Sequence, residues 1–248
     1  MRRAKRYYED QTRTFETGVI TDEHKRIASV ITTIAGTSGG SAKVLELGCG
    51  SGAVAAVLAD RGWAVTAIDF NAPAIAMARA FAESRLGRLV PVEGDVYTVD
   101  LPGPYDLVFY WDGFGVGEDE DQVQLLSRVK GWLAPGGRAV VDVFSPYFWM
   151  AKHGTSVVYQ ATNGETWERR IEFDFRACRL VDHWTNLDDP TVAPRSQSLR
   201  CYAPADISRL VSEAGLRLIE LFTSDGARII GNDVEAIRDR TSFLLLLE

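Results

Sequence analysis

Short apolar runs alternate with helical stretches along residues 43–144 of this 248-residue chain. The apolar runs are KVLELG, WAVTAIDF, LVPVEGD, YDLVFYW and RAVVDVF. The stretches between several of them space their apolar residues as a helix does. Strands that are apolar throughout and are separated by helices are typical of a parallel sheet covered on both faces. The pattern therefore predicts a doubly wound α/β core, whose ligands bind at the carboxyl ends of the strands.

The pattern changes after residue 144. Residues 171, 173 and 175 are apolar while residues 172, 174 and 176 are charged, which is the period of a half-buried strand. An Asn-Gly pair at 163–164 is a strong hairpin signal. We therefore expect a small antiparallel β insertion after the fifth strand.

Helices and strands are also expected at the two ends of the chain. Residues 21–35 have helical spacing behind a Thr or Asp cap. Residues 204–215 read as a helix ended by a glycine, and LRLIELF and SFLLLLE follow as two last strands. The fold class predicted is a mostly parallel seven-stranded sheet with one antiparallel insertion.

A glycine-rich loop, VLELGCGSG, follows the first apolar run. A phosphate-binding Walker loop would end in Gly-Lys-Ser/Thr, whereas Gly52 precedes Ala53. A dinucleotide fingerprint reads GxGxxG, whereas this loop reads GxGxG. Asp69 ends the second strand and could accept ribose hydroxyls of NAD or of an adenosyl ligand, so it does not discriminate between them.

Three further features distinguish the ligands. Glu46 lies inside the first strand, where a dinucleotide fold usually keeps an apolar residue, EGDV (93–96) places an acid after the third strand, and LAPGG forms a turn before the fifth. In order and spacing, VLELGCGSG, AIDFN, EGDVYTVDLP, YDLVFYWDGFG and LAPGGRAVVDV resemble the motifs of class I S-adenosylmethionine-dependent methyltransferases. The resemblance covers residues 43–144. The C-terminal half is similar, more loosely, to bacterial small-molecule enzymes of this class.

The resemblance implies a division of the chain and a cofactor. It implies an N-terminal helical lid segment (1–42), a cofactor-binding core (43–144), a β-rich substrate cover (145–203) and a segment that completes the core sheet (204–248). The cofactor implied is S-adenosyl-L-methionine. We also expect no metal and a role in secondary metabolism.

The resemblance also implies which residues bind the cofactor. Asp69 would accept the ribose hydroxyls, with Phe70 beside the adenine. Asp95 would accept from the adenine amino group, with Val96 packed on the ring, and Tyr110 would lie near the sulfonium. The full set of implied cofactor residues is Glu46, Gly48, Cys49, Gly50, Gly52, Asp69, Phe70, Asp95, Val96 and Tyr110.

Aromatic side chains are expected to form the acceptor pocket. Methyl transfer from a sulfonium needs alignment and exclusion of water, and electron-rich rings stabilise a cationic donor. The aromatics near strand ends or at the borders of the insertion are Tyr7, Tyr8, Trp111, Phe114, Tyr147, Trp149 and Tyr202. Ordinary core packing is the alternative for each of them.

Three side chains are candidates for handling the acceptor's proton or orienting the acceptor: Tyr8, Asp112 and His153. The acceptor expected is an aromatic or heteroaromatic small molecule. Methylation on carbon, nitrogen or oxygen all stay open, and an electron-rich ring carbon such as that of an indole would need no strong base.

The N-terminal segment is expected to close the site. Tyr7 and Tyr8 precede the predicted 21–35 helix, and an exposed aromatic pair beside a basic run needs something to pack on. We expect this segment to fold over the bound cofactor and to meet the insertion around Trp149.

Charge and composition exclude other partners. The net charge of −7 repels a phosphate backbone, and YWDGF lacks the Pro-Pro that nucleic-acid amino-methyltransferases carry after the fourth strand. No apolar run is long enough to span a membrane, and three scattered cysteines indicate neither disulfides nor zinc. We expect a cytoplasmic protein with a small-molecule acceptor, no nucleic acid and no membrane, and leave a homodimer open.

Two other functions remain consistent with the sequence. One is a nicotinamide-dependent oxidoreductase on the same type of sheet, which the missing GxGxxG and the otherwise unexplained EGDV disfavour. The other is an adenosyl-binding module without catalysis.

Overall fold

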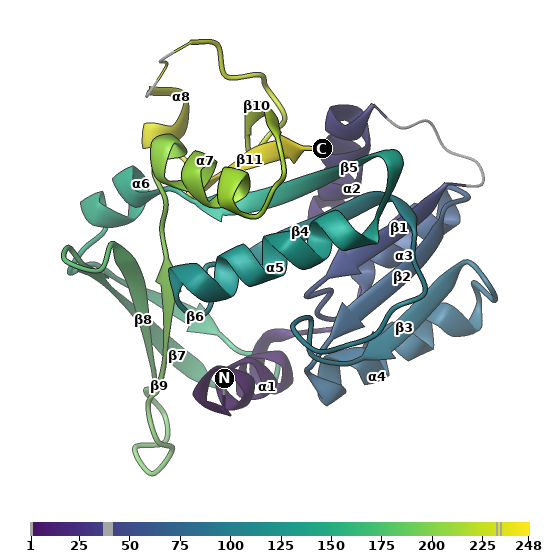
Figure 1. Ribbon diagram of the computed structural model, residues 1–248. Coiled ribbons are helices and arrows are strands. Elements are labelled where there is room, and N and C mark those ends of the chain that lie inside the picture. The colour runs from purple at the N-terminus through teal and green to yellow at the C-terminus, as the bar shows by residue number, and fades with distance from the viewer. Residues whose placement is uncertain (1, 37–41, 232, 234) are drawn as a thin grey trace.

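The structure is a computed structural model that describes residues 2–36, 42–231, 233 and 235–248. Its larger sheet has seven strands in the order β10-β11-β5-β4-β1-β2-β3 (Figure 1). Only β11 runs antiparallel to its neighbours, so the predicted mostly parallel seven-stranded sheet is confirmed. The strands are β1 (Lys43–Leu47), β2 (Ala64–Asp69), β3 (Leu89–Glu93), β4 (Tyr105–Phe114), β5 (Leu133–Phe144), β10 (Leu218–Thr223) and β11 (Ser242–Leu247).

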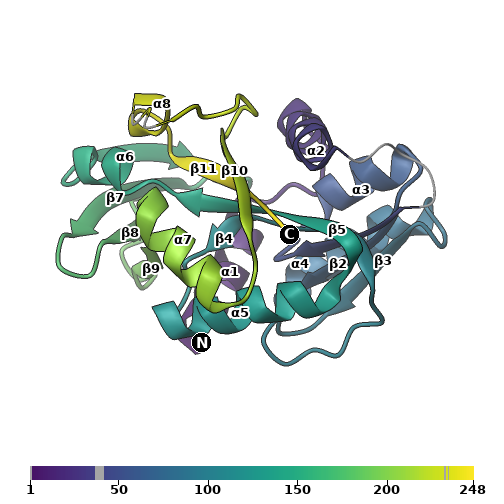
Figure 2. The same cartoon turned by 45° about the horizontal axis from the view of Figure 1, so that its top comes forward.

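Helices cover both faces of this sheet, as its continuously apolar strands require. Successive side chains point to opposite faces, so in β1 Val44 packs with the helices of one face and Leu45 with those of the other. Figure 2 shows α2 and α3 on one side and α5 and α7 on the other. The helices are α1 (Arg2–Phe15), α2 (Asp22–Ala35), α3 (Ala53–Asp60), α4 (Ala72–Glu83), α5 (Asp119–Trp132), α6 (Pro146–Ala151), α7 (Pro204–Glu213) and α8 (Glu235–Arg238).

None of the helices in the described ranges combines the length and apolarity that crossing a bilayer requires. The helix predicted over 21–35 is present as α2. Thr21 and His24 form a reciprocal capping box at its start, and Gly36 ends it in the left-handed region at φ 63°.

The glycine loop between β1 and α3 lies against two neighbouring elements. Gly48, Gly50 and Gly52 have φ values of 61°, 52° and 74°, which favour glycine. A Cβ on Gly52 would lie 2.7 Å from the Cβ of Ala78 in α4, and one on Gly48 would lie 2.6 Å from the Tyr110 ring. The loop needs glycine both for its backbone turns and for these close approaches.

The predicted antiparallel insertion is a separate four-stranded sheet after β5 (Figure 1). The aromatic stretch PYFWM that precedes it forms α6. Asn163 and Gly164 lie in the turn between the first two strands of the insertion, as the hairpin signal predicted. Its strands are β6 (Ser156–Gln160), β7 (Thr166–Asp174), β8 (Arg179–Asn186) and β9 (Arg195–Arg200).

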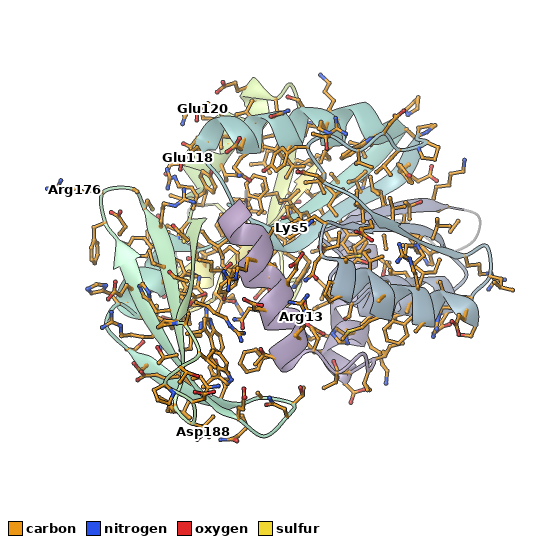
Figure 3. The ribbon with its side chains drawn as sticks, turned by 90° about the horizontal axis from the view of Figure 1, so that it is seen from below. Lys5, Arg13, Glu118, Glu120, Arg176 and Asp188 are labelled. Atoms are coloured by element: carbon orange, nitrogen blue, oxygen red, sulfur yellow. The ribbon has the colours of Figure 1, made fainter. Side chains whose placement is uncertain are left out.

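Helix α1 lies between the second sheet and the core (Figure 3). On the sheet side, Tyr7 is buried in a cluster with Trp167 and Trp184. The Arg195 guanidinium donates to the carbonyl of Asp10 at 3.0 Å, also on the sheet side. The contact therefore forms at Trp167 and Trp184, and the expectation that it would form around Trp149 is wrong.

On the core side, α1 is held at the start of α4. The Asn71 side-chain amide donates to the carbonyl of Tyr8 at 3.0 Å and to the hydroxyl of Thr12 at 2.7 Å. The Tyr8 ring contacts Phe70 edge-on, with ring centroids 5.9 Å apart. Helix α1 is thus a bridge between the two sheets.

We predict that Gly52→Ala destabilises the protein more than Gly62→Ala does. Both positions have positive φ, which costs an alanine about 1–2 kcal/mol. A Cβ on Gly62 would meet no heavy atom within 4 Å, whereas one on Gly52 would collide with Ala78. Overpacking adds about 1–3 kcal/mol, so urea unfolding should show that difference between the two variants. Equal losses of unfolding free energy in the two variants would contradict a close contact between Gly52 and α4.

Candidate functional site

A cavity of about 950 Å³ opens at the carboxyl ends of β1, β2, β3 and β4. The loops that follow these strands form its floor, and α1 and the start of α2 form its walls. This is the edge of a doubly wound sheet at which ligands bind. We call it the cofactor cavity.

Asp69 organises the glycine loop and also lines this cavity. Its carboxylate accepts the backbone N–H of Gly50 at 2.9 Å and that of Asn71 at 2.8 Å. Burial raises the pKa of Asp69, and these two amides act in the opposite direction. A carboxylate has acceptor sites beyond these two, so Asp69 can also accept vicinal hydroxyls of a ligand.

Glu46 is a buried acid at the bottom of the same cavity. It is 4% exposed, and its Oε2 has no hydrogen-bond partner among the described residues. Burial raises the pKa of Glu46 well above its ordinary value, and burial also raises that of the Cys49 thiol beside the loop. A carboxyl of this kind lacks a cationic partner, which the ammonium group of an amino-acid ligand would supply.

An apolar slot lies at the ends of β2 and β3. Phe70 and Val96 both line it, and the ring of Phe70 is supported by Tyr8. Asp95 follows β3 and accepts the backbone N–H of Tyr97 at 2.9 Å, which orients its carboxylate. The slot combines two apolar surfaces with one acceptor, as a flat base with an amino group requires.

All but one of the implied cofactor residues line the cofactor cavity. The exception is Gly52, which begins α3 and packs on Ala78 instead. Tyr8 also lines it, so this candidate lies on the cofactor side.

A second cavity of about 430 Å³ adjoins the first. It lies between the ends of β4 and β5, α2, α6 and the second sheet, and we call it the acceptor cavity. The expected residues Trp111 and Trp149 line it. The residues that line both cavities, and so mark their junction, are Tyr7, Glu23, Trp111, Asp112, Trp184 and Gln197.

Two ion pairs form part of the wall of the acceptor cavity. Arg169 donates to both carboxylate oxygens of Asp182, at 2.7 and 2.9 Å, and its guanidinium lies over the Trp149 ring at 5.3 Å. On α2, Arg26 pairs with Glu23 at 2.6 and 2.7 Å. These two carboxylates are therefore already neutralised.

Asp112 and Asp142 supply two further carboxylates without such a partner. The backbone N–H of Asp112 donates to Oδ2 of Asp142 at 3.2 Å, while Oδ1 of Asp142 has no partner among the described residues. Burial raises the pKa of Asp142 to about 7. Asp112 is an exposed residue at the cavity surface, and partial desolvation by the surrounding groups raises the pKa of its carboxyl. The described part of the acceptor cavity thus carries an excess of negative charge.

Several expected site residues, namely Phe114, Tyr147, His153 and Tyr202, line neither cavity. Phe114 and Tyr202 are fully buried in the main core, where the Tyr202 hydroxyl donates to Asp119 at 2.9 Å, and Tyr147 packs against the same core. His153 accepts the backbone N–H of Phe173 at 3.0 Å and contacts Phe175. Position along the chain placed them near the site, but none of them lines either cavity.

Asp112, which the sequence predicts as a site residue, lines the acceptor cavity, whereas the other charged residues of this cavity were not expected. Asp142 could have been noticed, because it is the one charged residue in the apolar run AVVDVF of a buried strand. Arg169 and Asp182 could not, since their pairing depends on the register between β7 and β8. Within the described ranges, no group of three or more His, Cys, Asp and Glu side chains is arranged to hold a metal ion.

Comparisons with known proteins agree with this geometry. Residues 44–137 match the family described as methyltransferase domain. The cypemycin N-terminal methyltransferase of a Streptomyces species is 35% identical over 106 residues, which are 42% of this chain and 42% of that protein. The match therefore spans less than half the length of this relative.

Solved structures extend the similarity to the whole fold. The CcbJ methyltransferase from Streptomyces caelestis has a TM-score of 0.77 at 22% identity, with 98% of this chain and 97% of that chain covered. CalS10, an amino pentose methyltransferase from Micromonospora echinaspora, has a TM-score of 0.58 at 23% identity, with 92% and 91% covered. At these identities the two structures show similarity of fold.

We predict that Asp142→Asn stabilises the ligand-free protein, and more so at high pH. The pKa of Asp142 rises from 3.8 to about 7 on folding, so its ionisation destabilises the folded state progressively as pH rises through this window. At about 1.4 kcal/mol per pH unit, the gain of the variant should widen by roughly 2–3 kcal/mol between pH 5 and pH 8.

Urea unfolding at the two pH values measures this gain, with Asp206→Asn, an exposed carboxylate, as the control. A gain in unfolding free energy that does not change with pH, or a loss at both pH values, would contradict the burial of Asp142 without a compensating cation.

Proposed function

We propose that this chain, a class I S-adenosylmethionine-dependent methyltransferase by its core sequence and fold, methylates an amine nitrogen of a small molecule. The observation that carries the proposal is the excess of carboxylates in the acceptor cavity, directly beside the cofactor cavity. An acceptor that brings a positive charge would balance them.

The residues of the cofactor cavity fit S-adenosylmethionine. Asp69 would accept the ribose hydroxyls, the unpartnered Glu46 would face the ammonium of the methionine part, and Phe70 with Val96 would enclose the adenine. When bound, this cofactor supplies a methyl carbon that its sulfonium makes electrophilic. The chain's own part is to align the acceptor with that carbon and to exclude water.

The walls of the acceptor cavity suit an amine with an apolar or ring-shaped body. Trp111, Trp149 and Trp184 supply large apolar faces, and such faces also attract cations. Asp112 lies at the junction, where an acceptor nitrogen must stand to meet the methyl group. The names of two similar proteins, an amino pentose methyltransferase and a cypemycin N-terminal methyltransferase, support an acceptor of the same kind.

A neutral aromatic or heteroaromatic acceptor is the second candidate. The three tryptophans that line the cavity favour it, and the sequence suggested it. A neutral ring, however, would leave the buried Asp142 without a cation and would cover Asp112 without supplying one, which is costly. We therefore place the amine first.

The proposal predicts that labelled S-adenosylmethionine methylates amines in preference to neutral rings. A panel of amino sugars, peptides with free N-termini and neutral heteroaromatic compounds, analysed by mass spectrometry, tests this. We expect labelled product from at least one amine. Product from neutral rings alone would replace the amine assignment. No product from any compound, with S-adenosylhomocysteine binding intact, would favour a module without catalysis.

Asp69→Ala should weaken binding of S-adenosylhomocysteine by at least roughly tenfold. Each lost hydrogen bond to a charged acceptor is worth about 1.5–3 kcal/mol, and about 1.4 kcal/mol is one decade in affinity. Calorimetry measures the change, with Asp100→Ala, an exposed carboxylate outside both cavities, as the control. Unchanged affinity in a folded Asp69→Ala protein would remove Asp69 from the site.

A further inference from the structure

Asp112 and Asp142 form a pair of carboxylates in the wall of the acceptor cavity. Asp112 lies in the loop-like end of β4 and lines both cavities, whereas Asp142 lies on β5 and lines the acceptor cavity alone. The backbone N–H of Asp112 donates to Oδ2 of Asp142 at 3.2 Å, which ties the two residues together. They are thus held side by side, with Asp112 nearer to the cofactor cavity.

This pair differs from the other acids that line the acceptor cavity. Asp182 and Glu23 each have an arginine partner within 2.7 Å. Within the part of the chain that the structure describes, no lysine, arginine or histidine nitrogen lies within 4 Å of either carboxylate of the pair. Asp142 is only 3% exposed, so water does not replace the missing cation well. A buried carboxylate with an unpartnered oxygen, next to a second carboxylate that lines the same cavity, indicates a site for a cationic ligand.

The backbone at Asp112 is also held in an uncommon conformation. Its φ is 54°, in the left-handed region that few residues other than glycine adopt. The pairing between β4 and β5 shifts register between Tyr110 and Phe114, so the chain bulges at this point. Strain of this type persists where the surrounding structure enforces it, often at functional sites. Here its effect is to place Asp112 at the junction of the two cavities.

The groups that face the pair keep its protonation sensitive to pH near neutrality. Burial is the main cause of the raised pKa of Asp142, and partial desolvation at the cavity surface is the main cause for the exposed Asp112. Across the cavity, Arg169 lowers the pKa of Asp112, while Asp182 and Glu16 raise it. The Ser242 hydroxyl on β11 and Arg26 on α2 lower the pKa of Asp142, and the charge of Asp112 raises it.

A pKa of about 7 lets Asp142 take up or release a proton near neutral pH.

We infer that Asp112 and Asp142 form an ammonium site that binds the acceptor as its protonated amine and removes one proton before methylation. The inference rests on the proposed function. It assigns Asp112 to hold the nitrogen at the junction and Asp142 to receive the proton. The ligand class is a protonated amine, because the nitrogen must carry a hydrogen to donate and must then regain a lone pair.

The inferred reaction has two steps, a proton transfer from the ammonium and a methyl transfer to the nitrogen. One N–H bond of the ammonium breaks, and its proton passes to the ionised carboxylate of Asp142, leaving the lone pair on nitrogen. That lone pair forms the bond to the methyl carbon as the carbon–sulfur bond breaks, and the electron pair of that bond remains on sulfur. The nitrogen becomes positively charged again, so the ionised Asp112 still has a cation beside it. Asp142 returns its proton to solvent when the product leaves.

Asp142→Asn and Asp112→Asn test the inference with the amine that the panel identifies. General acid–base groups contribute about 10²–10⁴-fold, so we expect kcat/KM at pH 8 to fall at least 100-fold in Asp142→Asn. In the wild type, kcat/KM should rise with pH as the pair ionises, and this limb should disappear in Asp142→Asn. Asp112→Asn should mainly raise KM for the amine, because its ammonium ligand is lost.

Both variants are expected to fold. Asparagine tolerates a positive φ at position 112, and a neutral side chain at 142 relieves a buried charge. Calorimetry with S-adenosylhomocysteine should give affinities within about twofold of wild type. This is well below the tenfold change in affinity that about 1.4 kcal/mol produces. Asp206→Asn, on the exposed side of α7, is the matched control and should keep wild-type kinetics.

The outcomes separate the inference from the proposed function. If the wild type methylates an amine but Asp142→Asn keeps its kcat/KM and its pH profile, the ammonium site is wrong and the amine function stands. If the wild type methylates only neutral rings, the proposed function fails, and the ammonium site fails with it. A loss of S-adenosylhomocysteine affinity equal to the loss of kcat/KM would assign the pair to the cofactor and would also overturn the inference.

Discussion

The parallel arrangement of β1, β2, β3 and β4 is the constraint on which the rest of the structure depends. Because these strands point the same way, the loops after all four of them meet at one edge of the sheet. The glycine loop can lie there only because it approaches Tyr110 and Ala78 without a Cβ, and Asp69 holds it through the N–H of Gly50. One edge thus gathers an acceptor for hydroxyls, an unpartnered acid and an apolar slot from segments far apart in sequence.

The edge alone does not enclose a reaction. The second sheet and α1 complete the enclosure, and they depend on each other because Tyr7 of α1 is buried against Trp167 and Trp184. The same α1 is bound to the core through Asn71. Residues of α1 therefore line both cavities, which makes the helix a common wall between cofactor and acceptor. A shift of α1 would change both sites together.

Local patterns along the chain predicted a large part of this arrangement. Apolar runs of strand length, helical spacing and an Asn-Gly turn are set by neighbouring residues, so the sheets and most helices could be inferred from them. The residues that line the cofactor cavity could also be predicted, because the loops after parallel strands carry them in a regular order. The residues of the acceptor cavity were predicted only in part: Trp111, Trp149 and Asp112 line it, whereas other expected residues do not. Three expected residues have suitable chemistry and positions, yet their side chains pack into the core (Phe114 and Tyr202) or against the second sheet (His153).

By itself, the sequence determined the doubly wound core, the antiparallel insertion and the edge at which the cofactor cavity lies, because each follows from periodicity and strand direction. The tertiary structure alone decided which charged groups meet. The pairing of Arg169 with Asp182, and the placement of Asp112 beside Asp142, depend on strand register, a bulge in β4 and the docking of a second sheet. Desolvation then changes the chemistry of these acids, and desolvation is a property of the assembled cavity that no short stretch of sequence contains.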